Sequence, residues 1–157
     1  MLVIKKYVYN TMRLSEHFDL EEFTKSETAE KNGISNQPTA AHLSNLKKLA
    51  NALEKIRALV GKPVMISSGY RSKELNRLVG GVQTSAHCQG LAADIYVSGM
   101  TPKELANLIA NSDIEYDQVI HEFGRWVHFG LNNNKNRKEK LTATKKNGRT
   151  VYLNGIV

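Results

Sequence analysis

A long amphipathic stretch between residues 39 and 60 dominates the hydrophobic pattern of the sequence. Its apolar side chains recur at intervals of three and four residues, the spacing that gathers them on one face of an α-helix. They are Leu43, Leu46, Leu49, Ala50, Leu53, Ile56 and Val60. Gly61 and Pro63 follow, and both residue types are typical of a helix end. The pattern therefore predicts one long helix from Thr39 to Val60, with one face buried.

After Asp113 the pattern changes to the alternation of polar and apolar residues that is typical of β-strands. Four strands are predicted there, at 116–122, 126–131, 140–146 and 149–155. The last two are joined around Asn147-Gly148, a strong tight-turn dipeptide. Two earlier strands are predicted at 63–68 and 92–97. This order predicts an α+β fold, with N-terminal helices packed on a small, mostly antiparallel β-sheet.

Three shorter helices are predicted from local capping signals. Asp19 can cap one or two helical turns, and residues 72–79 form a short helix ended by two glycines. From Thr101 onward, Pro102 occupies the first helical position and Glu104 completes a capping box. The short helices thus alternate with the two earlier strands along the chain.

Length and composition indicate a single domain. The chain has 157 residues, of which 41% are hydrophobic and 24% are charged. A chain of this size buries roughly two-thirds of its unfolded surface in one core. We therefore expect one domain over residues 1–157, with an N-terminal extension at 1–14 and a core at 15–155. We also expect a monomer.

Charge and cysteine content restrict the partners and the compartment. The net charge of +7 suits an anionic partner, but no aromatic-basic platform or helix-turn-helix signal predicts nucleic-acid binding. The single cysteine, Cys88, excludes an intramolecular disulfide and fits a reducing compartment. No signal peptide and no apolar run long enough to span a membrane are recognisable, so cytoplasmic synthesis is expected.

His87, Asp94 and His128 are candidate metal ligands. His87 and Asp94 lie seven residues apart across Gly90, so a turn could bring both side chains to one point. His128 lies in a predicted strand further along the chain. Catalytic zinc sites use three protein ligands and leave the fourth position for water. The pattern therefore predicts one zinc ion per chain.

Glu122 is the candidate general base beside this site. If residues 123–125 form a three-residue loop, Glu122 lies opposite Trp126 and close to His128 on the same face of the sheet. A carboxylate there could take the proton of a metal-activated water and return it to a leaving amine. A two-residue loop would instead place Glu122 on the other face.

Several motifs closely resemble the zinc D-alanyl-D-alanine metallopeptidases. The motifs are SGYRS at 68–72, Asn76, GGVQTSAHCQGLAAD at 80–94 and EFGRWVH at 122–128. That family contains D,D-carboxypeptidases, D,D-dipeptidases and phage L-alanyl-D-glutamate endolysins, and it shares its fold with Hedgehog signalling domains. The resemblance covers about residues 15–155 and is especially close to the short, phage-type members.

The resemblance implies roles for particular residues. It implies His87, Asp94 and His128 as zinc ligands, and Arg71 as the cation that polarises the scissile carbonyl or holds the oxyanion. Glu122 takes the position of the base. Some members carry that acidic residue three positions before the last histidine, where this chain has Arg125.

Other interpretations of these residues remain open at this point. Arg71 could be a surface arginine in a salt bridge. Ser85 and Gln83 are candidates to orient the site as neighbouring hydrogen-bonding groups, and Trp126 is either a core residue or a wall of the substrate pocket.

The predicted function is a zinc metallopeptidase that cuts peptidoglycan stem peptides next to a D-amino acid. Both a D,D-carboxypeptidase and an endolysin-type endopeptidase fit, and the sequence does not choose between them. For a phage endolysin, release to the cell wall by a lysis system is expected. The alternative is a non-catalytic, zinc-stabilised module that binds cell wall or protein.

Overall fold

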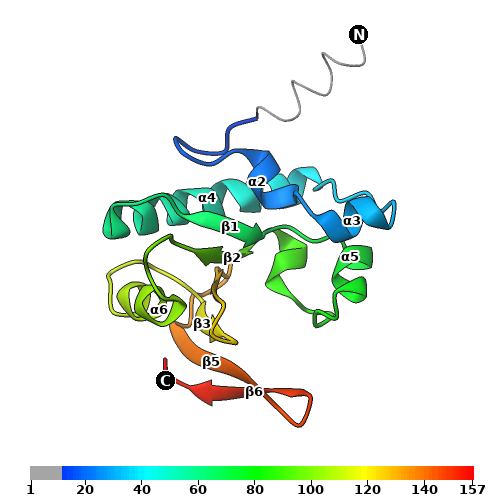
Figure 1. Ribbon diagram of the computed structural model, residues 1–157. Helices are drawn as coiled ribbons and strands as arrows, with labels where there is room; N and C mark the ends of the chain where they lie inside the picture. Colours follow the sequence, from blue (N-terminus) through cyan, green and yellow to red (C-terminus); the bar gives the residue numbers. More distant parts are fainter. Residues whose placement is uncertain (1–11) are drawn as a thin grey trace.

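The computed structural model describes residues 12–157, so most of the predicted N-terminal extension lies outside the described residues. The helices are α2 (Leu20–Thr24), α3 (Glu27–Lys31), α4 (Ala40–Val60), α5 (Lys73–Leu78), the 3-10 helix η1 (Ala86–Gln89) and α6 (Pro102–Ala110). The strands are β1 (Met65–Ser68), β2 (Ala92–Tyr96), β3 (Gln118–Glu122), β4 (Trp126–Gly130), β5 (Glu139–Lys146) and β6 (Arg149–Asn154). Helices α2, α3 and α4 lie at one end of the molecule and strands β5 and β6 at the other (Figure 1).

The long helix α4 confirms the pattern seen between residues 39 and 60. The Thr39 side chain caps it by accepting a hydrogen bond from the His42 backbone N–H, and Gly61 ends it in the left-handed conformation at φ 69°. Its buried residues are Leu46, Leu49, Ala50, Leu53 and Ile56. The capping box of α6, formed by Thr101 and Glu104, is also present as predicted.

The strands form one six-stranded sheet in the order β1-β2-β4-β3-β5-β6. Every neighbouring pair is antiparallel except β3 and β5, which run parallel. The sheet is therefore mostly antiparallel, as predicted, but the last strands are not a continuous antiparallel run. The physical reason is that β4 is already paired on both edges, with β2 and with β3. Residues 131–138 connect β4 to β5, and β5 then pairs with the edge of β3 that is still free.

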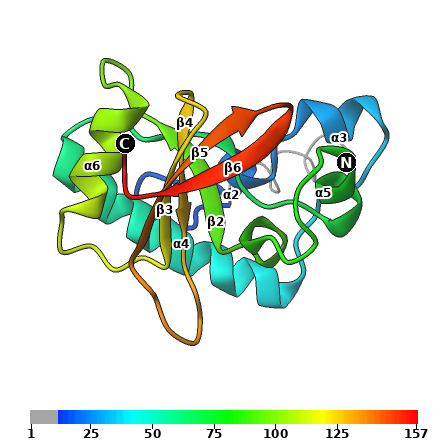
Figure 2. The same cartoon turned by 90° about the horizontal axis from the view of Figure 1, so that it is seen from below.

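The two faces of this sheet have different roles. Ala93, Ile95, Val119, Val127 and Phe129 belong to the main hydrophobic core, together with apolar residues of α4 and α6. Because neighbouring side chains in a strand alternate between faces, Asp94, Glu122 and His128 point to the opposite side. Seen from below in Figure 2, the β5–β6 hairpin lies in front of the other strands and α4 lies behind them. Helices α4 and α6 therefore cover one face, and polar residues of the central strands occupy the other.

No helix in the described part of the chain combines the length and the hydropathy needed to cross a membrane.

Asp117 anchors the connection between β4 and β5. Its carboxylate accepts hydrogen bonds from the Arg137 backbone N–H at 3.0 Å, from Nε at 2.9 Å and from Nη2 at 2.9 Å. These hydrogen bonds hold the pKa of Asp117 below its ordinary value, although partial burial opposes the shift. The Asp117 backbone also donates to Gly130 and accepts from Glu139. One buried residue thus ties both ends of residues 131–138 together.

Replacing Asp117 with asparagine is expected to lower the free energy of unfolding by about 1 kcal/mol at neutral pH, because charged hydrogen bonds to Arg137 are lost. The folded pKa is depressed, so this stabilisation is complete above the unfolded value of about 3.9 and is lost as pH falls through the folded value. Urea unfolding of both proteins should show a difference that is constant down to about pH 5 and shrinks below it. A difference that persists unchanged in stronger acid would contradict the ionic role.

Candidate metal centre

Three buried side chains from three separate elements converge on one point. His87 comes from η1, Asp94 from β2 and His128 from β4. Asp94 and His128 are direct cross-strand partners in the sheet, which places their side chains side by side on one face. His87 is brought over them by the turn between α5 and β2. These are the three residues that the sequence singled out as candidate ligands.

The ligand atoms form a nearly equilateral triangle. His87 Nε2 lies 3.2 Å from His128 Nδ1 and 3.3 Å from Asp94 Oδ1. The third side, from His128 Nδ1 to Asp94 Oδ1, is 3.2 Å. Ligand atoms about 2.05 Å from a tetrahedral zinc ion stand about 3.3 Å from one another. The triangle therefore has the size that a tetrahedral site with an open fourth position requires.

The tautomer of His87 also favours a cation at this point. His87 Nδ1 donates a hydrogen bond to the Gly69 carbonyl oxygen at 2.7 Å, so Nε2 of the neutral ring presents its lone pair. That lone pair faces the Asp94 carboxylate and the second imidazole. Such backbone-oriented histidines are common among metal ligands. A Cβ at position 69 would lie 2.6 Å from the Phe23 carbonyl oxygen, so only glycine fits there. The carbonyl group that accepts the hydrogen bond from His87 therefore belongs to a residue that must be glycine.

The ionisation of the three groups follows from burial and from their mutual contacts. Burial raises the pKa of Asp94, but the charges and hydrogen bonds of His87 and His128 outweigh it, and the pKa falls well below its usual value. Burial lowers the pKa of His87. For His128, burial is outweighed by the hydrogen bond and charge of Asp94, and its pKa is raised. Asp94 is thus an anion, which suits a divalent cation.

Arg71 lies at the edge of the triangle and is not a free surface arginine. Its side chain is only 15% exposed, and Nη2 lies 3.8 Å from Asp94 Oδ2. Nη1 donates to Asn76 Oδ1 at 2.9 Å, and Nε donates to Ser68 Oγ at 3.3 Å. A Cβ at Gly81 would overlap both Asn76 and Arg71, so the glycine leaves room for this arrangement. The guanidinium is therefore held in one orientation beside the candidate metal ligands.

Glu122 lies beside His128, as the three-residue loop predicted. Glu122 pairs with Trp126 across the β3–β4 hairpin, and its Oε1 lies 3.8 Å from His128 Nδ1. The loop at 123–125 holds Phe123 and Gly124 in the left-handed region, at φ 56° and 66°. Burial first, and then the Asp94 charge, raise the pKa of Glu122. A partly buried carboxylate of raised pKa suits a proton carrier.

Two further candidates lie close to these residues. Trp126 Nε1 donates to Glu122 Oε2 at 2.8 Å, so the indole holds the carboxylate in place rather than simply filling the core. Ser85 Oγ accepts from the His87 backbone N–H at 3.2 Å and caps η1. Gln83 is exposed and is not among the described residues that line the cleft, so the structure gives no support for its expected orienting role.

The site opens into a cleft of about 1010 Å³. One wall comes from the turn at 79–89, and the other from β3, β5, β6 and residues 131–137. Lys145, Thr150 and Tyr152 line this second wall, and the sequence reasoning did not find them. The sequence predicted the strands that carry these residues and the alternation of their side chains. It did not predict that β5 is the neighbour of β3.

Two imidazoles and one carboxylate around an open position, with a second carboxylate beside them, define the class of metal-dependent hydrolases. The family model described as Peptidase M15 matches residues 16–130. The chain therefore belongs to this family of zinc-dependent metallopeptidases, and the predicted resemblance and the predicted α+β fold are confirmed. A search of curated proteins found no significant match.

Proposed function

We propose that this protein is a zinc peptidase that hydrolyses peptidoglycan stem peptides at a bond next to a D-amino acid. The observation that supports it best is the position of Glu122, a cleft carboxylate 3.8 Å from His128 that the ligand triangle itself does not need. A structural metal site has no use for such a group. A hydrolase needs one to move protons.

In this proposal His87, Asp94 and His128 hold the metal. When bound, zinc supplies a Lewis acid that makes water a nucleophile near neutral pH. Glu122 accepts the proton of the attacking water and later delivers it to the leaving amine, while Trp126 keeps the carboxylate oriented. Arg71 directs its guanidinium toward the carbonyl oxygen on which negative charge develops.

The cavities around the site favour the endopeptidase over the carboxypeptidase. A second cavity of about 670 Å³ shares Arg71 and Val79 with the main cleft and extends past Trp126 toward β1 and α3. A peptide in this groove would have room for residues on both sides of the scissile bond. The net charge of +7 supports adhesion to an anionic cell wall.

The test is digestion of purified peptidoglycan by the zinc-loaded protein, followed by mass spectrometry of the soluble fragments. New fragments are expected, and their termini identify the cleaved bond. Internal stem-peptide cleavage would support the endopeptidase, whereas loss of only the terminal residue would support the carboxypeptidase. An intact wall, with zinc bound and the protein retained on it, would instead favour the non-catalytic binding module.

A further inference from the structure

The β5–β6 hairpin presents one of its faces to the metal cleft. Ala143 pairs with Glu122 on one side and with Tyr152 on the other, so these three side chains form a row on the same face of the sheet. Lys145 and Thr150 pair in the next row on that face. All of the hairpin lies beyond residues 16–130, the part that matches the family model.

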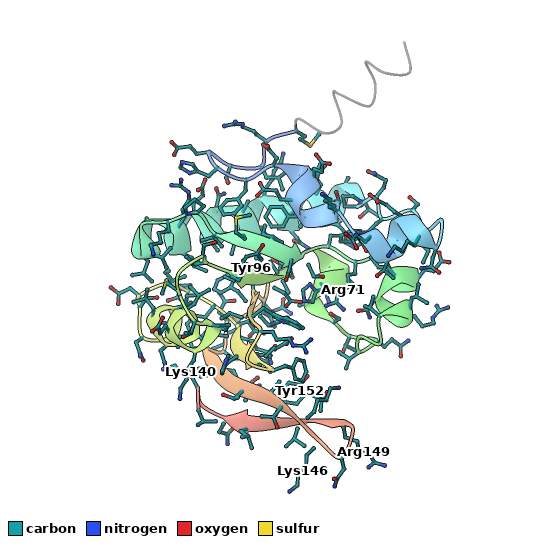
Figure 3. The ribbon with its side chains drawn as sticks, in the orientation of Figure 1. Arg71, Tyr96, Lys140, Lys146, Arg149 and Tyr152 are labelled. Atoms are coloured by element: carbon teal, nitrogen blue, oxygen red, sulfur yellow. The ribbon has the colours of Figure 1, made fainter. Side chains whose placement is uncertain are left out.

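Tyr152 faces Glu122 across a small residue. The two positions are two strands apart, which corresponds to about 10 Å between backbones. Ala143 lies between them and is only 1% exposed, so neighbouring side chains cover its small methyl group. Figure 3 shows Tyr152 on the side of the hairpin toward Arg71, while Lys146 and Arg149 lie on the far side. Tyr152 and Arg71 both line the cleft, Tyr152 from the β5–β6 hairpin.

Lys145 brings a positive charge to the same wall. Its Nζ donates to Thr150 Oγ1 at 3.0 Å and lies 5.3 Å from the centre of the Phe123 ring. Within residues 12–157, no carboxylate oxygen lies within 4.0 Å of this ammonium group. Arg137, the cation at the other end of the cleft, is already bound to Asp117. Lys145 is thus the cation on this wall that is free to bind an anion.

We propose that Lys145 and Tyr152 form a subsite that binds a carboxylate of the peptide substrate beside the cleaved bond. The ammonium group supplies the charge, and the phenol hydroxyl supplies a directed hydrogen bond. The inference rests on the proposed function, because it names the chemistry of the substrate at that site. The carboxylate is either the C-terminus of the peptide or an acidic group within it.

The experiment measures peptide binding without turnover. Glu122→Gln protein, loaded with zinc, is titrated calorimetrically with a stem peptide and with forms amidated at the C-terminus or at the internal acidic group. Lys145→Met and Tyr152→Phe are each added to this background. Lys146→Met is the matched control, since it removes the same charge from the adjacent residue on the opposite face.

Lys145→Met is expected to weaken binding of the free peptide by about fivefold, the upper range for an exposed ion pair. Amidation of the group that Lys145 binds should cause a similar loss, and the two losses should not add. Tyr152→Phe should weaken binding less, and Lys146→Met should leave it unchanged. The amidated peptide whose affinity no longer depends on Lys145 identifies which carboxylate is bound.

Three results would overturn the subsite. Lys145→Met and Lys146→Met could weaken peptide binding equally, the losses in affinity from Lys145→Met and from amidation could add fully, or no peptide could bind at all. The proposed peptidase fails separately, if wild-type protein leaves peptidoglycan intact. Lys145-dependent binding without cleavage would keep the subsite and reject the catalytic function.

Discussion

Glu122→Gln protein is expected to lose about 10²- to 10⁴-fold in kcat while it keeps its metal, the range typical of a general acid-base group. The amide has nearly the same shape and can still accept the hydrogen bond from Trp126 Nε1, but it cannot accept a proton from water. Glu122 is not one of the three converging ligand atoms, so zinc content should not change.

Three measurements define this result: the cleavage rate of a stem peptide, the zinc content by mass spectrometry and the thermal unfolding midpoint. Glu115→Gln is the control, because Glu115 is an exposed acid that pairs with Lys138 and lies outside the cleft lining. It should behave as the wild type. Loss of zinc from the Glu122 variant would show that the residue supports the metal rather than moving a proton.

Replacing His87 with alanine is expected to abolish both metal binding and hydrolysis. Only Asp94 and His128 would remain of the three candidate ligands, and two ligands do not hold zinc in competition with water and chelators. The substitution leaves the buried Asp94 carboxylate with fewer partners, so the protein should also be less stable. Zinc content should fall from about one ion per chain to near zero.

Thermal unfolding with and without a chelator gives a readout independent of activity. A ligand that binds only the folded state at 100 times its Kd stabilises it by about 2.7 kcal/mol. The chelator should therefore lower the Tm of the wild type and leave that of the His87 variant unchanged. Cys88→Ser is the control, because Cys88 is adjacent in sequence but is not part of the triangle. A chelator effect that persists in the His87 variant would place the metal elsewhere.

Much of the fold could be predicted because its signals are local. The apolar spacing in α4, the caps at Thr39 and Thr101, and the Asn147-Gly148 turn each depend on residues close in sequence. The position of Glu122 also depends on residues close in sequence. Once the loop at 123–125 has three residues, strand alternation alone puts this carboxylate on the face of His128.

The remaining features depend on contacts between distant segments. The pairing of β5 with β3 arises because β2 already occupies the far edge of β4. This pairing brings Lys145 and Tyr152 into the cleft, where no local pattern predicted them. Likewise, only the packed structure separates Ser85, which caps the helix of His87, from the exposed Gln83.

The sequence by itself determined the helices α2, α4, α5 and α6, the strand faces and the residue types of the candidate metal centre, because periodicity and capping act over a few residues. The short helices α3 and η1 were not predicted. The tertiary structure decided the strand order, the 3.2–3.3 Å triangle of ligand atoms and the second wall of the cleft. These depend on which sheet edges remain free after the central strands have paired, and that competition involves residues far apart in the chain.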